Sequence, residues 1–216
     1  MISKLKKDGD NQSNLASTLM QYKSLPPRYY GLPKIHKPTL ALRPIVSSIN
    51  APNSKITKWL TKILTISYCS NNPYYVKDTF DFSTFINEKE LLEGEVLCSL
   101  DVISLFPNIP RKLVNDSISK RWNLISQNCG LNKEKFSDLI NFVFDTSFCL
   151  YQNVAYKQIF GTPMGSKMSP IIAQYIMDDL VENCLSQLSF TPTFFKKIVD
   201  NIVCSLLIKL MNFRYF

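Results

Sequence analysis

Apolar residues recur at helical spacing in several stretches of the chain and cluster in short runs in others. From position 54 to position 64 the apolar residues fall on one helical face and three lysines fall on the other, and Asn53 or Ser54 can cap the start. Similar patterns follow Pro110, Asn132 and the pair Ser169-Pro170, so each is expected to begin a helix. A shorter acidic helix is expected near residues 88–93.

The remaining patterned segments are short and read as strands. Six prolines between residues 25 and 52 exclude long helices there and leave extended segments. A buried strand is expected over 95–100, ending at Asp101, and two further segments read as hairpins. The expected strand segments are 42–47, 95–100, 148–158, 194–199 and 202–207. This mixture predicts an α+β fold.

Composition places the chain among folded proteins with a positively charged first third. Its 216 residues are 45% hydrophobic and 12% aromatic, which argues against disorder. Residues 1–80 carry 12 Lys and Arg against 3 Asp and Glu, whereas residues 81–216 carry 13 against 14. A phosphate-rich partner is expected to dock on such a surface, although a basic face without any partner has the same composition.

The spacing of the cysteines and the length of the apolar runs indicate where in the cell the protein is located. The six cysteines form no CxxC pair and have no neighbouring histidine, so they predict reduced core residues rather than a zinc site. The first residues lack the apolar run of a signal peptide, and no segment reaches the roughly 18 apolar residues of a membrane span. We therefore expect an intracellular, reducing location and no membrane partner.

Two aspartates lie where metal ligands are placed in nucleotidyl-transfer sites. Asp101 follows a strand, Asp200 lies at a hairpin tip, and a Gly-rich segment at 161–170 that opens a helix lies between them. Two carboxylates on adjacent strands can hold two divalent cations about 3.5–4 Å apart, and Mg²⁺ prefers such oxygen ligands. Taken singly, each motif is better explained as an ordinary turn; the indication comes from their order.

The ordered motifs resemble those of Penelope-like element reverse transcriptases, which are relatives of telomerase. The sequences YGLPKIHKP at 30–38 and RPIVSS at 43–48 resemble their fingers motifs, and SLDVISLFPNIP at 99–110 resembles palm motif A. The segment from Gln158 through GTPMGSKMSP at 161–170 resembles motif B, and IVDN at 198–201 resembles motif C. The resemblance extends from about residue 29 to residue 203.

This resemblance implies a fold and a set of roles. The fold is that of the fingers and palm of a right-hand polymerase, with an antiparallel palm sheet backed by helices and the thumb missing. The implied reaction is RNA-directed DNA synthesis on an RNA template from a DNA primer and deoxynucleoside triphosphates, in the nucleus, with two Mg²⁺ or Mn²⁺ ions. The implied ligands are Asp101, the Val102 carbonyl and Asp200 for the metals, Lys34 and Arg43 for the triphosphate, Phe106 under the sugar, and Met164 and Gly165 under the base pair.

Two departures from the family pattern leave a second interpretation open. Asn201 stands where motif C normally has a second aspartate, and the matched region stops shortly after it. We therefore expect little or no polymerase activity from these 216 residues, and little restoration by Asn201→Asp alone. The alternative is an inactive nucleic-acid-binding remnant of a retroelement, and a weaker one is a basic protein-interaction domain.

The expected organisation is a flexible basic arm at 1–24, a fingers-like region at 25–94, a palm-like region with motifs A, B and C at 95–207, and an unmatched tail at 208–216. Three features are given structural explanations. Asp178-Asp179 is assigned to a solvated helix face, His36 to a phosphate or structural contact, and the lysines at 55, 58 and 62 to a solvated face that is also able to touch nucleic acid.

Overall fold

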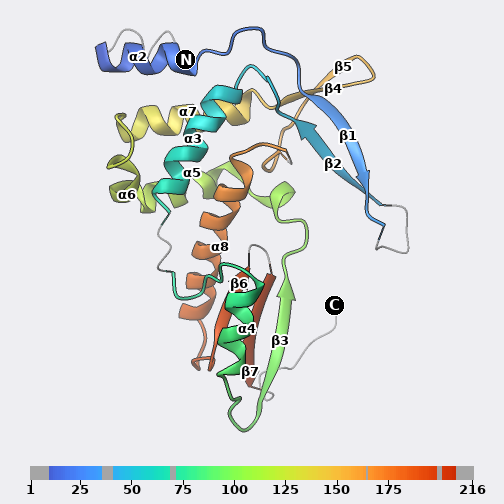
Figure 1. Cartoon of the computed structure of the whole chain (residues 1–216), viewed down its shortest axis with the longest axis vertical. Helices are drawn as coiled ribbons and strands as arrows, with labels where there is room; N and C mark the ends of the chain where they lie inside the picture. The colour runs from blue at the N-terminus through green and yellow to red at the C-terminus, as the bar shows by residue number, and fades with distance from the viewer. Residues whose placement is uncertain (1–9, 36–40, 69–71, 164, 199–200, 208–216) are drawn as a thin grey trace. The chain divides into compact units, whose positions relative to one another are not determined.

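The chain divides into two compact units that are interleaved along the sequence. Unit 1 takes residues 1–68 and 106–176, and unit 2 takes residues 69–105 and 177–216 (Figure 1). The computed structural model describes residues 10–35, 41–68, 72–163, 165–198 and 201–207. None of the helices within these ranges combines the length and apolar character that crossing a lipid bilayer requires.

Unit 1 combines a sheet with a group of helices. Its last helix, α8, runs over Ser169–Ser186 and continues into unit 2. Its other elements are α2 (Asp10–Leu19), β1 (Arg28–Pro33), β2 (Leu42–Ser47), α3 (Ser54–Ile66), a 3-10 turn (Phe106–Asn108), α5 (Arg111–Lys120), α6 (Trp122–Ser126), α7 (Lys133–Asp145), β4 (Phe148–Tyr151) and β5 (Val154–Lys157).

The four strands of unit 1 lie in the order β2-β1-β4-β5. β1 and β2 form an antiparallel pair in which Gly31 lies opposite Pro44, and Pro44 is tolerated because β2 is an edge strand of this sheet. β4 and β5 are joined by Gln152 and Asn153, both with positive φ (50° and 62°). Left-handed residues at both turn positions match the twist of a two-residue hairpin, as the sequence predicted.

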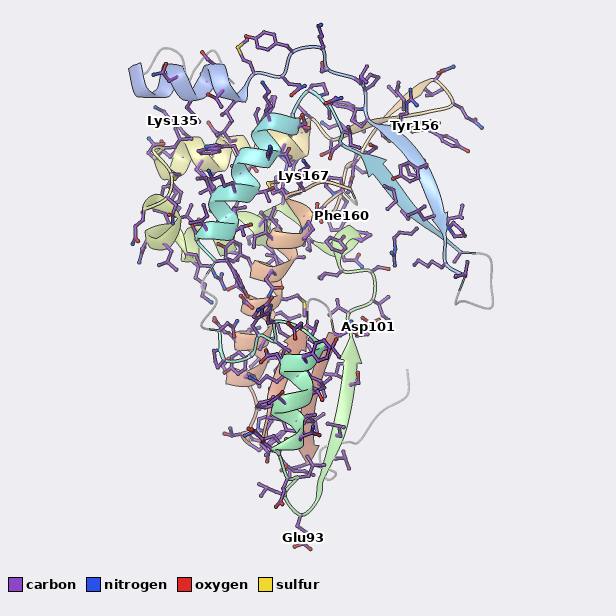
Figure 2. All side chains as sticks on the ribbon, viewed as in Figure 1. Glu93, Asp101, Lys135, Tyr156, Phe160 and Lys167 are labelled. Atoms are coloured by element: carbon purple, nitrogen blue, oxygen red, sulfur yellow. The ribbon has the colours of Figure 1, made fainter. Side chains whose placement is uncertain are left out.

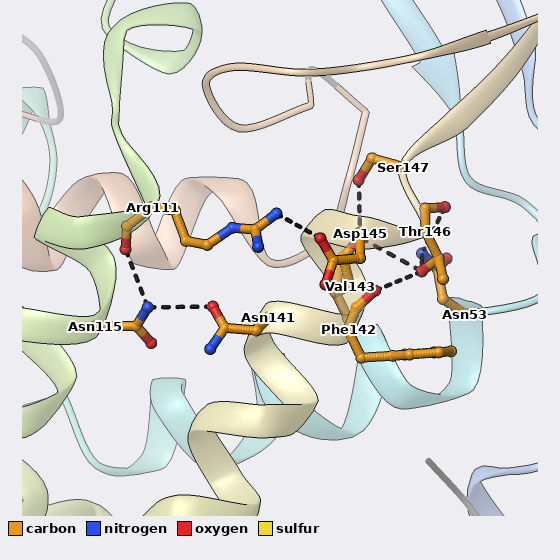
Figure 3. Close-up of polar contacts among 9 residues, drawn as sticks. All are labelled: Asn53, Arg111, Asn115, Asn141, Phe142, Val143, Asp145, Thr146 and Ser147. Carbon is orange, nitrogen blue, oxygen red and sulfur yellow. Dashed lines mark hydrogen bonds and ion pairs between the residues drawn. The ribbon is translucent and has the colours of Figure 1, made fainter.

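The helices of unit 1 pack through apolar faces and are joined by polar contacts at their ends. Trp59 of α3 and Trp122 of α6 both pack against the buried Phe136 of α7 with their rings tilted, and their ring centroids lie 6.1 and 5.6 Å from that of Phe136. Figure 3 shows the polar contacts: Arg111 pairs with Asp145 at 2.8 Å, joining α5 to α7. The predicted cap of α7 is confirmed, because the Asn132 side chain accepts a hydrogen bond from the Lys135 amide.

Unit 2 contains a three-stranded antiparallel sheet in the order β3-β7-β6. Its elements are α4 (Thr79–Asn87), β3 (Glu95–Asp101), the second half of α8, β6 (Phe195–Ile198) and β7 (Asn201–Leu207). Both strands of the predicted 194–207 hairpin are therefore confirmed. On the other side of β6, Tyr75 forms an isolated parallel bridge to Lys197, and the aromatic rings of Phe85 and Phe194 join α4 to this sheet.

A carboxylate fixes the start of β3. Glu95 accepts hydrogen bonds from the Thr193 hydroxyl (2.6 Å), the Ser205 hydroxyl (3.0 Å) and the Leu92 amide (3.0 Å). Hydrogen bonds to the ionised carboxylate, that of Thr193 above all, lower the pKa of Glu95 below its ordinary value.

Three local predictions were wrong. The helix expected near 88–93 lies earlier, because the Asp78 side chain caps Phe80 and Asp81 and starts α4 at Thr79. The basic arm contains helix α2, whose Ala16 and Leu19 are buried. The strand at 95–100 is not buried on both faces: Leu97 is 56% exposed, since β3 is an edge strand of this sheet. The arm, fingers and palm boundaries stay predictions, and the 208–216 tail lies outside the described residues.

Candidate functional site

Strands β3 and β7 place the motif A aspartate beside Asn201, the last residue of motif C. β3 ends at Asp101, β7 begins at Asn201, and these two residues lie directly opposite each other in the antiparallel register. Residues paired in this way point to the same face of a sheet, with Cβ atoms about 4.5–5.5 Å apart. Figure 2 shows Asp101 at the end of β3, with its side chain exposed. Asp200, the neighbour of Asn201 in the sequence, lies outside the described residues.

The groups at this strand end are oxygen donors. Asp101 supplies a carboxylate, Val102 follows with a backbone carbonyl, and Asn201 has an amide oxygen in place of an anion. This donor set has the chemistry that Mg²⁺ and Mn²⁺ prefer. In the parts of the chain that the structure describes, no group of three or more His, Cys, Asp or Glu side chains is able to hold a metal ion.

The two predicted triphosphate cations lie on one hairpin of unit 1. Arg43 of β2 lies opposite Leu32, and the Lys34 amide continues the ladder by donating to the Ala41 carbonyl at 2.8 Å. Lys34 and Arg43 are therefore diagonal neighbours on the same face of the hairpin. Arg43 is exposed and Lys34 is half-buried. The hairpin can present two positive charges together.

The end of motif A is joined to the start of motif B by backbone contacts. The Phe106 carbonyl accepts hydrogen bonds from the Thr162 amide (2.8 Å) and the Thr162 hydroxyl (3.1 Å). Gly161 next to it has φ +74°, and a Cβ at this position would lie 2.3 Å from the Pro107 carbonyl oxygen. Only glycine allows these two backbones to approach so closely. Phe106 itself is half-buried.

Motif B also packs against β2, the strand that carries the second fingers motif. Gly165 has φ +104°, and a Cβ there would lie 2.3 Å from the Val46 carbonyl oxygen of β2. The Ser48 hydroxyl donates to the Gly165 carbonyl at 2.8 Å. Gly165 is therefore needed for its contact with β2, besides any role toward a base pair. Met164 lies outside the described residues.

Unit 1 thus holds three of the motif segments together, namely β2 with Arg43, the Phe106–Asn108 turn and the residues around Gly165. Asp101 and Asn201 belong to unit 2. The convergence of Lys34, Arg43 and Phe106 on the Asp101 carboxylate, and the approach of Asp200 to Asp101, stay predictions.

The sequence pattern gave the wrong environment for Asp178. Its side chain is 6% exposed and pairs with Lys197 of β6, the two charged atoms lying 2.6 Å apart. The signal was present in the helical spacing, because Asp178 lies three residues from Tyr175 and from Val181, both of which are buried. Asp179 is half-buried, and the lysines at 55, 58 and 62 are exposed as predicted. His36 lies outside the described residues.

Comparison with solved structures identifies the fold. A telomerase from Candida tropicalis in its apo form aligns with 94% of this chain at 13% identity and a TM-score of 0.59. A C-terminally truncated form of apo telomerase from the same organism aligns with 89% at 15% identity and a TM-score of 0.58. A telomerase from Candida albicans, bound to a fragment of telomeric RNA, gives 11% identity over 89% and a TM-score of 0.57.

The chain has a reverse-transcriptase-like fold. The α+β fingers-and-palm architecture that the motifs predicted is confirmed, including the antiparallel palm sheet. The chain spans less than half the length of these telomerases, at 46%, 43% and 41%. No family model and no curated protein matches the sequence. At such low identities the likeness establishes the fold alone.

Proposed function

We propose that this chain is the fingers-and-palm part of an RNA-directed DNA polymerase of the Penelope-like type. In the proposed reaction the 3′-hydroxyl of a DNA primer attacks the α-phosphorus of a deoxynucleoside triphosphate, and pyrophosphate leaves. The observation that supports it most is the register that sets Asp101 directly opposite Asn201. Motifs A and C must meet in this way for such a site to exist, although their aspartates are 99 residues apart in the sequence. An intracellular, nuclear location is part of the proposal.

The proposed metal ligands are Asp101, the Val102 carbonyl and Asp200. Bound Mg²⁺ or Mn²⁺ would offset the charge that develops on the phosphoryl oxygens and lower the pKa of the attacking hydroxyl. Asp101 would provide the anionic charge that holds the ions at the strand end. Asn201 would contribute an amide oxygen without charge, which weakens the attraction for divalent cations.

The proposed nucleotide contacts lie in unit 1. Arg43 and Lys34, on one face of their hairpin, would bind the triphosphate, where a guanidinium and an ammonium offset phosphate charge. Phe106 would line the sugar position and disfavour a 2′-hydroxyl. Met164 and Gly165 would form the surface under the nascent base pair.

One observation favours a second function. Because Asn201 lies directly opposite Asp101, the missing charge is at the predicted centre of the metal site and not at its margin. A chain with this substitution is also suited to bind a primer–template without extending it. The two functions differ in their need for Asp101: polymerisation requires its carboxylate, whereas binding to the phosphate backbone does not.

Primer extension on an RNA template, with Mg²⁺ or Mn²⁺, tests the first function. Extension by the wild-type chain that Asp101→Ala abolishes would support a polymerase. Glu93→Gln is the matched control, because Glu93 is an exposed carboxylate near the other end of β3 (Figure 2). Extension that survives Asp101→Ala would contradict the proposal.

Salt-dependent binding to a labelled primer–template tests the second function. Affinity that falls steeply with salt, is unchanged in Asp101→Ala and is accompanied by no extension would support an inactive binding remnant. Absence of both binding and extension would contradict both functions and favour a protein-interaction domain.

A further inference from the structure

The most deeply buried charge in the described part of unit 2 is the Lys197 ammonium. Lys197 is on β6, its exposed fraction is 0%, and its Nζ lies 2.6 Å from Asp178 Oδ1 on α8. Lysine and aspartate are almost never fully buried unless they are paired. The pair therefore joins the sheet of unit 2 to the helix behind it at one defined point.

Hydrogen bonds close this pair into a ring. The Asn72 side-chain amide donates to the same Asp178 oxygen at 2.8 Å, and its own carbonyl oxygen accepts from the Tyr74 amide at 2.9 Å. The Tyr74 carbonyl in turn accepts from the Lys197 amide at 2.7 Å, and the Lys197 carbonyl accepts from the Val76 amide at 3.1 Å. The backbone of Lys197 is therefore bonded directly to the 72–76 segment, and its side chain is connected to Asn72 of that segment through Asp178.

The position of Lys197 in the register connects this ring to the candidate site. Lys197 lies opposite Ile202, and the next pair along the hairpin is Ile198 with Asn201. Asn201 also lies opposite Asp101. A slip of β6 by one residue would turn every side chain to the opposite face, including the lysine that has to reach Asp178. Only one register satisfies the ring.

The chemistry of the pair explains why an ion pair occupies this position. Burying two charges costs a large desolvation energy, and a well-packed apolar pair of similar size is often as stable or more stable. An apolar pair, however, tolerates sliding and rotation, whereas a short ion pair with an additional amide donor does not. The pair is suited to fixing geometry rather than to adding stability.

We propose that Lys197 and Asp178 are positioning residues that hold β6 and β7 in the register that sets Asn201 opposite Asp101. This inference rests on the proposed polymerase site for its functional meaning. Neither residue is placed in contact with metal, nucleotide or primer. The role of the pair is to fix the register of the strand that leads into residues 199–201.

The double variant Lys197→Met/Asp178→Leu, made in the full chain, separates positioning from stability. It removes both charges and leaves no unpaired buried ion, so its thermal midpoint is expected to stay at or above that of the wild type. Hairpin amides from Asn201 to Ser205 are expected to exchange about tenfold faster, and the affinity for Mn²⁺ is expected to fall about tenfold.

The matched control is Lys196→Met. Lys196 is the neighbouring residue on β6, and its ammonium reaches the Pro73 carbonyl at 2.6 Å outside the ring. This variant is expected to leave hairpin exchange and Mn²⁺ affinity within about twofold of the wild type. Wild-type hairpin protection in the folded double variant would overturn the proposal.

The two readouts also separate this inference from the proposed function. If Asp101→Ala leaves Mn²⁺ binding unchanged, the proposed metal site is wrong. Hydrogen exchange of the hairpin amides still tests the positioning role in that case. If the single variant Lys197→Met does not fold, the double variant carries the test. Unchanged hairpin exchange in a folded double variant would refute positioning whatever the metal result.

Discussion

Replacing Gly165 by alanine should destabilise unit 1 strongly, because two independent features of the site exclude a Cβ. The backbone has φ +104°, and the added carbon would lie 2.3 Å from the Val46 carbonyl oxygen. An unfavourable φ costs about 1–3 kcal/mol, and loss of the hydrogen bond from the Ser48 hydroxyl costs about 0.5–1.5 kcal/mol. The expected decrease in the free energy of unfolding is therefore about 1.5–4.5 kcal/mol.

Gly130→Ala is the matched control within the same unit. Gly130 has no positive φ, and a Cβ there meets no atom within 4 Å. Its replacement should change the free energy of unfolding by less than about 1 kcal/mol. The change should be stabilising, because alanine lowers the conformational entropy of the unfolded chain. Gly161→Ala should resemble Gly165→Ala, because its Cβ would lie 2.3 Å from the Pro107 carbonyl oxygen at φ +74°.

Urea unfolding, monitored by tryptophan fluorescence, measures the difference in stability between Gly165→Ala and Gly130→Ala and reports on unit 1. The chain has two tryptophans, Trp59 and Trp122, and both are in unit 1 against the Phe136 ring. With a slope of about 2 kcal/mol per molar urea, the midpoint of Gly165→Ala should fall by about 1–2 M. A midpoint equal to that of Gly130→Ala would show that motif B is not seated on β2 as described.

Three further outcomes are expected. Because the pKa of Glu95 is lowered in the fold, its carboxylate stabilises the protein above the unfolded-state pKa, and this stabilisation is lost as the pH falls through the folded-state pKa. Glu95→Gln should therefore destabilise unit 2 at pH 7. In thermal unfolding, its difference from the wild type should shrink below about pH 4.5. Burial, together with the nearby Cys98, raises the pKa of Cys204 to about 11. A disulfide reagent at pH 8 should therefore modify the exposed Cys184 in the folded protein and Cys204 only after unfolding. Equal rates of modification would contradict the burial of Cys204. Arg43→Ala should weaken binding of a fluorescent deoxynucleoside triphosphate about tenfold, and an unchanged affinity would remove Arg43 from the proposed site.

Local patterns in the sequence were sufficient for most elements. The periodicity from Ile56 to Leu64 and the Asn132 cap specified α3 and α7, because helix faces and caps depend on residues within one or two turns. The turn at Gln152 and Asn153 is equally local. The helix expected near 88–93 was misplaced because the helix start is set by the Asp78 cap, so that the helix has ended by Asn87. The ordered motifs also led to the correct fold, because spacing over many residues is more specific than any single motif.

Only the tertiary structure decided which distant groups meet. The ordered motifs predicted that motif A and motif C lie on adjacent strands. The register that sets Asp101 opposite Asn201 was decided by the fold, because the pattern of one strand does not identify which residue of its partner lies opposite. The same holds for the need for glycine at Gly165, which arises from the Val46 carbonyl of another strand. Asp178 shows the limit most clearly. The sequence analysis assigned it to a solvated helix face, because a buried aspartate without a cation is highly unfavourable, and only the fold supplies Lys197 as that cation.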